Sequence, residues 1–120
     1  MQNPDNLRVS SEAEELAIVV YDYTAGFPKE ERYGLAAQMR RAAVSVGSNI
    51  FEGCSRQTDK SLLAFLYISH GSAGEIQFQL RIARKRAYGD PSLATALERQ
   101  LLNTRRMLAR LIRKLEQRSV

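Results

Sequence analysis

The stretch LLAFLYISHGSAGEIQFQLRIA, residues 62–83, decides the fold because it carries apolar and small residues on two sides at helical spacing. The first set recurs every three or four positions, which is the period of one face of an α-helix. This set comprises Leu62, Phe65, Ser69, Ala73, Ile76, Leu80, Ala83 and Ala87. The pattern predicts a helix over residues 58–88, about 45 Å long, capped by Thr58 or Asp59 and buried along this face.

A second stripe lies on roughly the opposite side of the same helix. It comprises Tyr67, Gly71, Gly74, Phe78 and Ile82. An ordinary bundle helix needs one apolar face, and a glycine inside a helix costs about 1 kcal/mol relative to alanine. Two such glycines favour the close approach of another backbone. The second stripe therefore predicts the interface of a homo-oligomer, and the alternative is a monomer with scattered exposed apolar side chains.

The chain before this helix begins with a segment that we expect to be a flexible arm, residues 1–10. A capping box of Ser11 and Glu14 predicts the start of a helix over residues 12–26. In such a box the hydroxyl accepts a hydrogen bond from an amide of the first turn, and the carboxylate bonds back to the cap amide. Gly26 is expected to end this helix in the left-handed conformation.

Two more helices complete the pattern. Pro28 suits a first helical position and predicts a helix over residues 29–53. Its buried stripe is expected to contain Leu35, Met39, Ala42, Val46 and Ile50. Gly89-Asp90-Pro91 marks a stop and a new start, so a last helix should cover residues 91–117. Its apolar positions are Leu93, Leu97, Leu101, Leu108, Leu111, Ile112 and Leu115.

Length and composition place these helices in one all-α domain over residues 1–120. The chain is 44% apolar, enough for one core but not for two domains. Four amphipathic helices with short connections predict an antiparallel up-down-up-down four-helix bundle. The single cysteine, Cys54, excludes an intrachain disulfide, no leader opens the sequence, and the apolar runs are too short to cross a bilayer. We expect a cytoplasmic protein without membrane contact.

Positive charge is concentrated in the second half of the chain. Residues 1–60 carry 7 basic and 9 acidic side chains, whereas residues 61–120 carry 11 basic and 4 acidic ones. Two arginine-rich groups stand out: Arg99, Arg106, Arg110 and Arg113 on one side of the last helix, and Arg81, Arg84, Lys85 and Arg86 near the end of the preceding one. Such groups suit phosphate binding through counterion release, and the alternative is an ordinary solvated face. No aromatic residue interleaves with the first group, so contacts to bases are poorly supported.

Residues suited to catalysis or metal binding are few. His70 is the single histidine and Tyr67 stands three residues before it, so the Glu-x-x-His pairs of a di-iron bundle are missing. Cys54 has no base close to it in sequence. The glycine-rich stretch at residues 71–74 lies inside a helix, where its amides are already hydrogen-bonded, so it is not a phosphate loop. We expect no catalytic residues, no metal and no cofactor.

The segment RRAAVSVGSNIFEG, residues 40–53, combines small, apolar and polar residues. Its apolar positions can face the core, and Ser45, Ser48 and Asn49 can bond to neighbouring helices. Glu52 can pair with Arg56 across the helix end. We interpret this segment as structural.

Four ordered motifs carry a family resemblance over about residues 12–115. They are Phe27-Pro28, Gln38-x-Arg40-Arg41-Ala42, Asn49-Ile50-x-Glu52-Gly53 and Gly71-Ser72-x-x-Glu75. In these motifs the chain resembles the bacterial four-helix-bundle family named after proteins encoded in intervening sequences of 23S ribosomal RNA. Phe51 departs from the family pattern, which usually has alanine there.

The resemblance implies antiparallel protomers assembled into a homopentameric ring with a central channel. Similar bundles are accessory proteins of diversity-generating retroelements, where a basic pentamer contacts reverse transcriptase and nucleic acid. The family has no established catalytic residues. We therefore expect a non-enzymatic, basic, homo-oligomeric scaffold that binds structured RNA, DNA or a nucleic-acid enzyme. The alternative is a protein–protein interaction module with no nucleic-acid role.

Overall fold

The computed structural model describes residues 2–118 of the chain. In this part of the chain every regular element is helical, as predicted. The elements are η1 (Pro4–Asn6), α1 (Arg8–Thr24), η2 (Lys29–Glu31), α2 (Leu35–Cys54), α3 (Asp59–Lys85) and α4 (Pro91–Arg118), where η denotes a short 3-10 helix.

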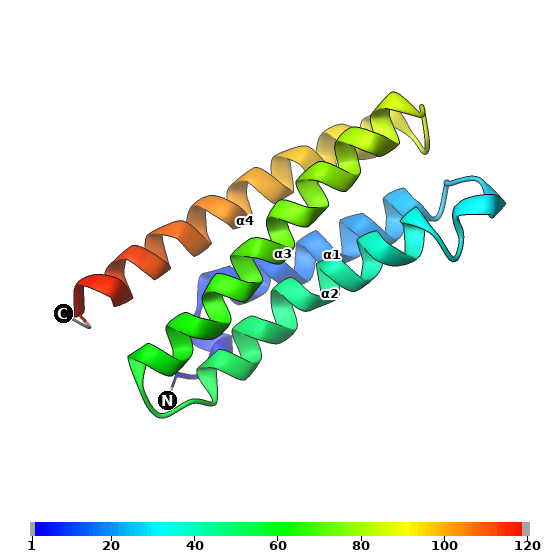
Figure 1. Cartoon of the computed structure of the whole chain (residues 1–120). Coiled ribbons are helices and arrows are strands. Elements are labelled where there is room, and N and C mark those ends of the chain that lie inside the picture. The colour runs from blue at the N-terminus through cyan, green and yellow to red at the C-terminus, as the bar shows by residue number, and fades with distance from the viewer. Residues whose placement is uncertain (1, 119–120) are drawn as a thin grey trace.

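The four long helices form an up-down-up-down bundle measuring 46 × 22 × 21 Å. Both chain ends and the α2–α3 connection lie at one end of the bundle, and the other two connections lie at the opposite end (Figure 1). Each helix packs against the two that flank it in a square, in the order α1, α2, α3, α4 and back to α1. The pair α1 and α2 therefore lies on the opposite side of the bundle from the pair α3 and α4.

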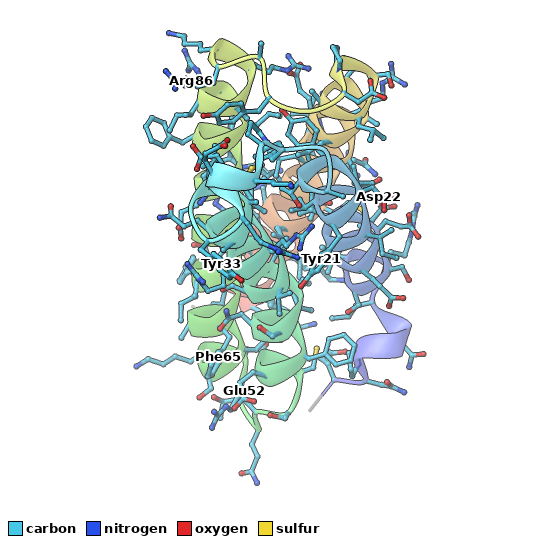
Figure 2. The ribbon with its side chains drawn as sticks, turned by 90° about the vertical axis from the view of Figure 1, so that its right-hand side faces the viewer. Tyr21, Asp22, Tyr33, Glu52, Phe65 and Arg86 are labelled. Carbon is cyan, nitrogen blue, oxygen red and sulfur yellow. The ribbon has the colours of Figure 1, made fainter. Side chains whose placement is uncertain are left out.

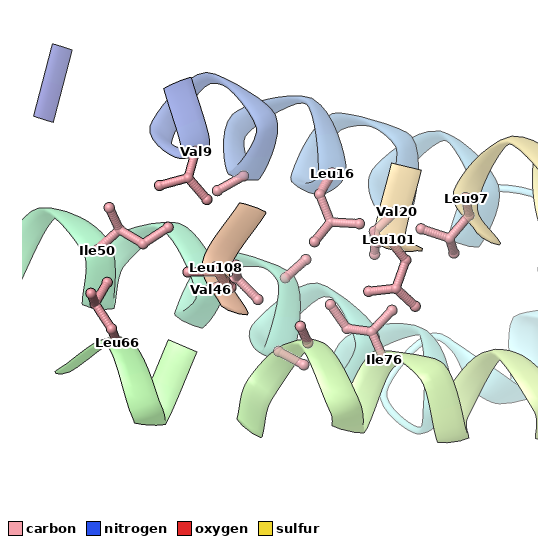
Figure 3. Packing of buried hydrophobic residues seen from close by; sticks show 14 of the residues in the cluster. Val9, Leu16, Val20, Val46, Ile50, Leu66, Ile76, Leu97, Leu101 and Leu108 are labelled. Atoms are coloured by element: carbon pink, nitrogen blue, oxygen red, sulfur yellow. The ribbon is translucent and has the colours of Figure 1, made fainter. Parts of the chain in front are cut away.

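The core runs along the axis of the bundle and is built from the predicted stripes. Leu16, Val46, Ile76, Leu97 and Leu108 are fully enclosed by side chains from the other helices (Figure 3). Burying each such side chain stabilises the fold by about 1.5–3 kcal/mol. The apolar periodicity read from the sequence thus identifies the inward faces of α2 and α4 and most of that of α3; no stripe was predicted for α1.

Two members of the predicted α3 stripe do not lie in the core. Phe65 is half-buried and Ala87 is exposed. Leu66, which the prediction omitted, is fully buried instead. The difference arises because the inward face of α3 is centred closer to Leu62, Leu66 and Ala73 than the predicted row was.

The prediction of a flexible arm and a capping box at Ser11 is wrong for the described residues. Helix α1 begins at Arg8, and its N-cap is Leu7, which makes no side-chain capping bond. Val9 is only 4% exposed. Burial of a valine outweighs a capping bond of about 1 kcal/mol. The amide of Gln2 donates to the carbonyl of Cys54 at 3.0 Å, so this segment is tied to the bundle; residue 1 of the predicted arm lies outside the described residues.

The α1–α2 connection is longer than predicted. Helix α1 ends at Thr24, and Gly26 does not adopt the left-handed conformation. Short turns instead carry the chain to Phe27, whose ring packs edge-on against Tyr23 with centroids 5.0 Å apart. Helix α2 then begins at Leu35 rather than residue 29, because a carboxylate oxygen of Glu31 accepts the Leu35 amide at 3.0 Å and caps the helix.

Helix α3 ends three residues earlier than predicted, at Lys85. Ala87 takes the left-handed conformation at φ 56°, and the Tyr88 amide bonds back to the Ala83 carbonyl at 2.9 Å. This closure brings Tyr88 to the core, where its carbonyl accepts the Tyr23 hydroxyl at 2.9 Å. Gly89 follows at φ 76°, and a Cβ there would lie 2.7 Å from the Tyr23 ring, so only glycine fits.

The predicted caps at the starts of the last two helices are confirmed. The Thr58 hydroxyl accepts the Ser61 amide at 3.1 Å. A carboxylate oxygen of Asp90 accepts the Ser92 amide at 2.8 Å, with Pro91 in the first helical position. Each cap satisfies an amide that the helix itself leaves without a partner.

Candidate nucleic-acid and subunit interfaces

The outer face of α4 carries the first predicted cationic group, which we call the arginine row. It comprises Arg99, Arg106, Arg110 and Arg113. All four side chains are exposed on the side of the helix opposite the buried Leu97, Leu101 and Leu108. The ion pairs within the described chain involve other residues. The sequence prediction that these arginines share one solvent-facing side is therefore met by the geometry.

The second predicted cationic group is divided by the structure. Arg84 pairs with Glu98 of α4 at 2.7 Å. Arg86 lies beyond the end of α3 (Figure 2) and donates to the Tyr88 hydroxyl at 3.4 Å. Lys85 is exposed, whereas Arg81 turns toward α4. The four residues do not form one patch.

A groove of about 570 Å³ lies between α3 and α4. Its apolar lining includes Leu80, Leu101, Leu102 and Ala109, and its basic lining includes Arg81, Arg84, Arg105 and Arg106. We call it the α3/α4 groove. Leu102 is 51% exposed, which is unusual for a leucine beside a core. An apolar floor with a cationic rim suits an amphipathic, negatively charged partner.

Arg105 is the groove residue that the sequence prediction missed. Its Nε is buried and has no hydrogen-bond partner among the described residues. One terminal nitrogen of its guanidinium donates to the Gln77 side-chain oxygen. Arg105 directly precedes Arg106 and lies about a quarter-turn around α4 from the arginine row. Periodicity alone therefore assigned it neither to the arginine row nor to the buried leucine face.

His70 lies half-buried at the edge of the α3/α4 groove. Burial lowers the pKa of its imidazole below the ordinary value, and the positive charge of Arg105 lowers it further. Both effects favour the neutral form of the ring. A neutral imidazole beside a guanidinium adds no charge of its own to the groove.

The second stripe of α3 remains outside the core, and we call it the outer stripe. Phe78 is 65% exposed and Tyr67 is 49% exposed. A Cβ at Gly71 would have no heavy atom within 4 Å, and one at Gly74 would meet only an Arg105 nitrogen at 3.9 Å. No backbone of the described chain approaches these glycines, so the close approach that they favour is not made within the protomer.

Small residues bring α2 and α3 into close contact. The hydroxyls of Ser45 and Ser72 lie 2.8 Å apart, and the Ser69 hydroxyl donates to the Val46 carbonyl at 2.7 Å. The Asn49 side chain donates to Ser45 within α2. A Cβ at Gly53 would lie 2.8 Å from Leu62. The structural interpretation of residues 40–53 is thus supported by their contacts.

The motif residues on the outside of this contact surround a polar pocket of about 380 Å³. Its lining includes Gln38, Arg41, Ser45, Ser72, Glu75 and Gln79. The predicted ion pair between Glu52 and Arg56 forms at 2.5 Å, but both side chains are exposed. Glu52 and Phe65 lie at the opposite end of the bundle from Arg86 (Figure 2). The ion pair belongs to the α2–α3 connection, whereas the arginine row lies on α4.

Cys54 is buried at the end of α2, and burial raises the pKa of its thiol. A raised pKa reduces the thiolate fraction and hence nucleophilic reactivity. Residues 2–118 contain no group of three or more His, Cys, Asp or Glu side chains placed to hold a metal ion. None of their helices is both long and apolar enough to cross a membrane.

Comparison with known proteins connects this geometry to one family. The profile of the family described as 23S rRNA-intervening sequence protein matches residues 5–110. A crystal structure of a protein of unknown function from the S23 ribosomal protein family of Bacteroides thetaiotaomicron VPI-5482 is similar in fold. The two chains are 19% identical with a TM-score of 0.77, over 87% of this chain and 97% of that one. No curated protein matches the chain in sequence.

Proposed function

This chain belongs to the 23S rRNA-intervening sequence protein family, and from that premise we propose that it is a non-enzymatic, basic, homo-oligomeric scaffold that binds structured RNA. The observation that carries the proposal is the arginine row, which is exposed on the outside of α4 and makes no ion pair with the described residues. From Arg99 to Arg113 the row spans about 21 Å at the rise of an α-helix. The planar guanidinium fork binds two phosphate oxygens at once.

The composition of α4 favours contact with the RNA backbone rather than with bases. The helix contains no aromatic residue on which an unstacked base could lie. Double-stranded RNA is recognised largely through its shape, its phosphates and its 2′-hydroxyls. We therefore propose that the arginine row recognises the helical shape of double-stranded RNA and does not distinguish between base sequences.

Assembly would strengthen this binding. The exposed outer stripe supports an interface between copies, and the family resemblance implies five copies in a ring. Once one arginine row of an oligomer has bound an RNA molecule, the other rows of the same particle are held close to it. Their high effective concentration raises the overall affinity above that of a single row. A homopentamer would thus hold RNA tightly even if each row contributed little.

The test is the salt dependence of binding to an RNA hairpin. Affinity should fall steeply between about 50 and about 200 mM salt. Replacing Arg99 and Arg110 with glutamine should reduce the slope of log affinity against log salt by about 1 per arginine. Both residues lie outside the lining of the α3/α4 groove, so assembly should be unaffected.

The matched control is the variant R32Q/R41Q, which removes the same charge from exposed positions outside α4. It should leave the salt slope close to that of the intact chain. Absence of binding at low salt, or equal losses in both variants, would overturn the proposal.

A second candidate function is a protein–protein interaction module. The apolar floor of the α3/α4 groove favours it, because nucleic acid offers little apolar surface to cover such a floor. Capture of specific protein partners that survives nuclease treatment, together with absence of RNA binding, would support this candidate over the first.

A further inference from the structure

The bundle has a second exposed apolar surface, on the side opposite the α3/α4 groove. Ile18 and Tyr21 of α1 are 48% and 45% exposed, and Val44 and Phe51 of α2 are each 49% exposed. A Cβ at Gly47, between the latter two, would lie 3.7 Å from Ala13 of α1, so this edge of α2 borders α1. We call this surface the α1/α2 face.

The α1/α2 face is acidic where the groove is basic. Glu14, Glu15 and Asp22 are exposed on α1 near Ile18 and make no ion pair within the described chain. Asp22 and Tyr21 lie on the outside of α1 (Figure 2). One nearby cation is Arg40, whose guanidinium lies 4.7 Å from the centre of the Tyr21 ring and donates to the Thr24 hydroxyl at 2.8 Å.

The opposite side presents the complementary set. Phe78 and Ile82 of the outer stripe and Leu102 of the groove are all exposed. Arg81 and Arg106 line the groove together with Leu102 and make no ion pair in the described chain. Carboxylates outnumber the one cation, Arg40, named on the α1/α2 face, and arginines outnumber the one carboxylate, Glu98, in the groove lining.

Charge decides how two copies can meet. If two grooves faced each other, arginines would oppose arginines, and two α1/α2 faces would oppose carboxylates with carboxylates. Contact between unlike faces pairs guanidinium with carboxylate and covers both apolar centres. We propose that the α3/α4 groove and outer stripe of one copy receive the α1/α2 face of the next copy, head to tail.

This inference rests on the homo-oligomeric part of the proposed function and specifies its interface. A head-to-tail contact between opposite sides of one protomer leaves a free groove at one end and a free acidic face at the other. Such contacts propagate, and they form a closed ring where the rotation between successive subunits closes. The arginine row of α4, except Arg106 at the rim of the groove, stays outside the contact and remains accessible.

Two exposed-site variants separate head-to-tail pairing from a symmetric dimer. Phe78→Glu damages the groove side and leaves the acidic face intact, whereas Ile18→Glu does the reverse. Each variant alone should run as a single chain in sedimentation velocity. An equimolar mixture should form a complex of one copy of each, which cannot grow because its two outer faces are both damaged.

The control is Tyr33→Glu, at an 88% exposed position outside both faces, which should assemble like the intact chain. Circular dichroism would verify that each variant is folded, and the milder pair Phe78→Ser and Ile18→Ser serves if a glutamate variant is not. Normal assembly of Ile18→Glu alone, or no complex in the mixture, would overturn head-to-tail pairing.

Cross-linking provides a second readout. A chain carrying both Ile18→Cys and Leu102→Cys should form a covalent ladder with a short bismaleimide, and each single variant should not. Self-cross-linking of the Leu102→Cys variant alone would contradict the proposal. RNA binding is measured separately: an intact chain that is a monomer defeats the oligomeric proposed function, whereas an oligomer whose variants do not complement defeats only this pairing.

Discussion

The two sides of α3 differ in how closely they meet their neighbours. On the α2 side, serine hydroxyls meet at 2.8 Å and Gly53 leaves no room for a Cβ. On the α4 side, a groove of about 570 Å³ separates the outer parts of the two helices and exposes Leu102. One side of the helix is completed within the protomer, and the other offers surface to a partner.

The size of the side chains on the α2 side and the charge of those on the α4 side account for this difference. Serines and glycine allow two helix backbones to approach closely, and their few polar groups find partners there. Arginines on both α3 and α4 cannot be buried together without unpaired charge, so their helices separate toward the outside. The comparison shows that charged side chains on two neighbouring helices can leave an apolar groove between them, to which another chain can bind.

The largest expected effect contrasts two leucines of α4. Leu108 is fully buried, whereas Leu102 on the groove floor is 51% exposed. Leu108→Ala should lower the free energy of unfolding by about 2–5 kcal/mol, and Leu102→Ala by less than about 0.5 kcal/mol. Urea denaturation in the Phe78→Glu background keeps assembly from contributing. Similar losses for both would mean that the groove floor is already part of the protomer core.

A smaller effect contrasts the glycines on the two sides of α3. A Cβ at Gly53 would lie 3.0 Å from the Phe65 Cβ and 3.3 Å from the Leu62 carbonyl, so Gly53→Ala should destabilise the protomer by about 1–3 kcal/mol. Gly71 has open space around its Cα. Gly71→Ala should stabilise the same monomeric background by up to about 1 kcal/mol through helix propensity. If both substitutions stabilised the protomer, the claim that α3 is closely packed on its α2 side and open on its outer side would be contradicted.

The smallest expected effect is the titration of His70, which reports on the groove alone. As the single histidine, it gives one imidazole signal in NMR. Its pKa should lie below 6.5, because burial and Arg105 both disfavour the charged ring. Arg105→Gln should raise this pKa, and Arg41→Gln, on α2, should not change it.

The sign of the pH effect on stability follows from the same shift. The unfolded chain takes up a proton at higher pH than the folded chain, so His70 contributes stability that is present above the unfolded pKa of 6.5 and is lost as pH falls through the folded value. His70→Gln should remove this loss. A His70 pKa above 6.5 would show that its environment is not the one described.

Most of the fold could be predicted because apolar spacing reports burial directly. The rows through Met39, Val46 and Leu97 lie in the core, except that Leu35, Leu93 and Leu111 are partly buried and pack against it. Helix ends were less predictable, since a capping motif is local whereas its competitor is tertiary. The burial of Val9 overrode the box at Ser11, and Glu31 capped α2 from a preceding turn.

The candidate interfaces were predicted in part. Spacing within one helix was sufficient for the arginine row and the outer stripe. It could not place Arg81 and Arg106 in the lining of one groove, because that depends on how α3 and α4 align. Nor could it reveal the α1/α2 face, which combines residues from two helices and becomes visible only when their exposure is known.

The most direct test of the central claim is the mass of the intact chain and of its Phe78→Glu variant in native mass spectrometry. The account predicts a multiple of the 13.6 kDa protomer for the intact chain and a single protomer for the variant. A mass of 13.6 kDa for the intact chain at every concentration, or an assembly unchanged by Phe78→Glu, would contradict it.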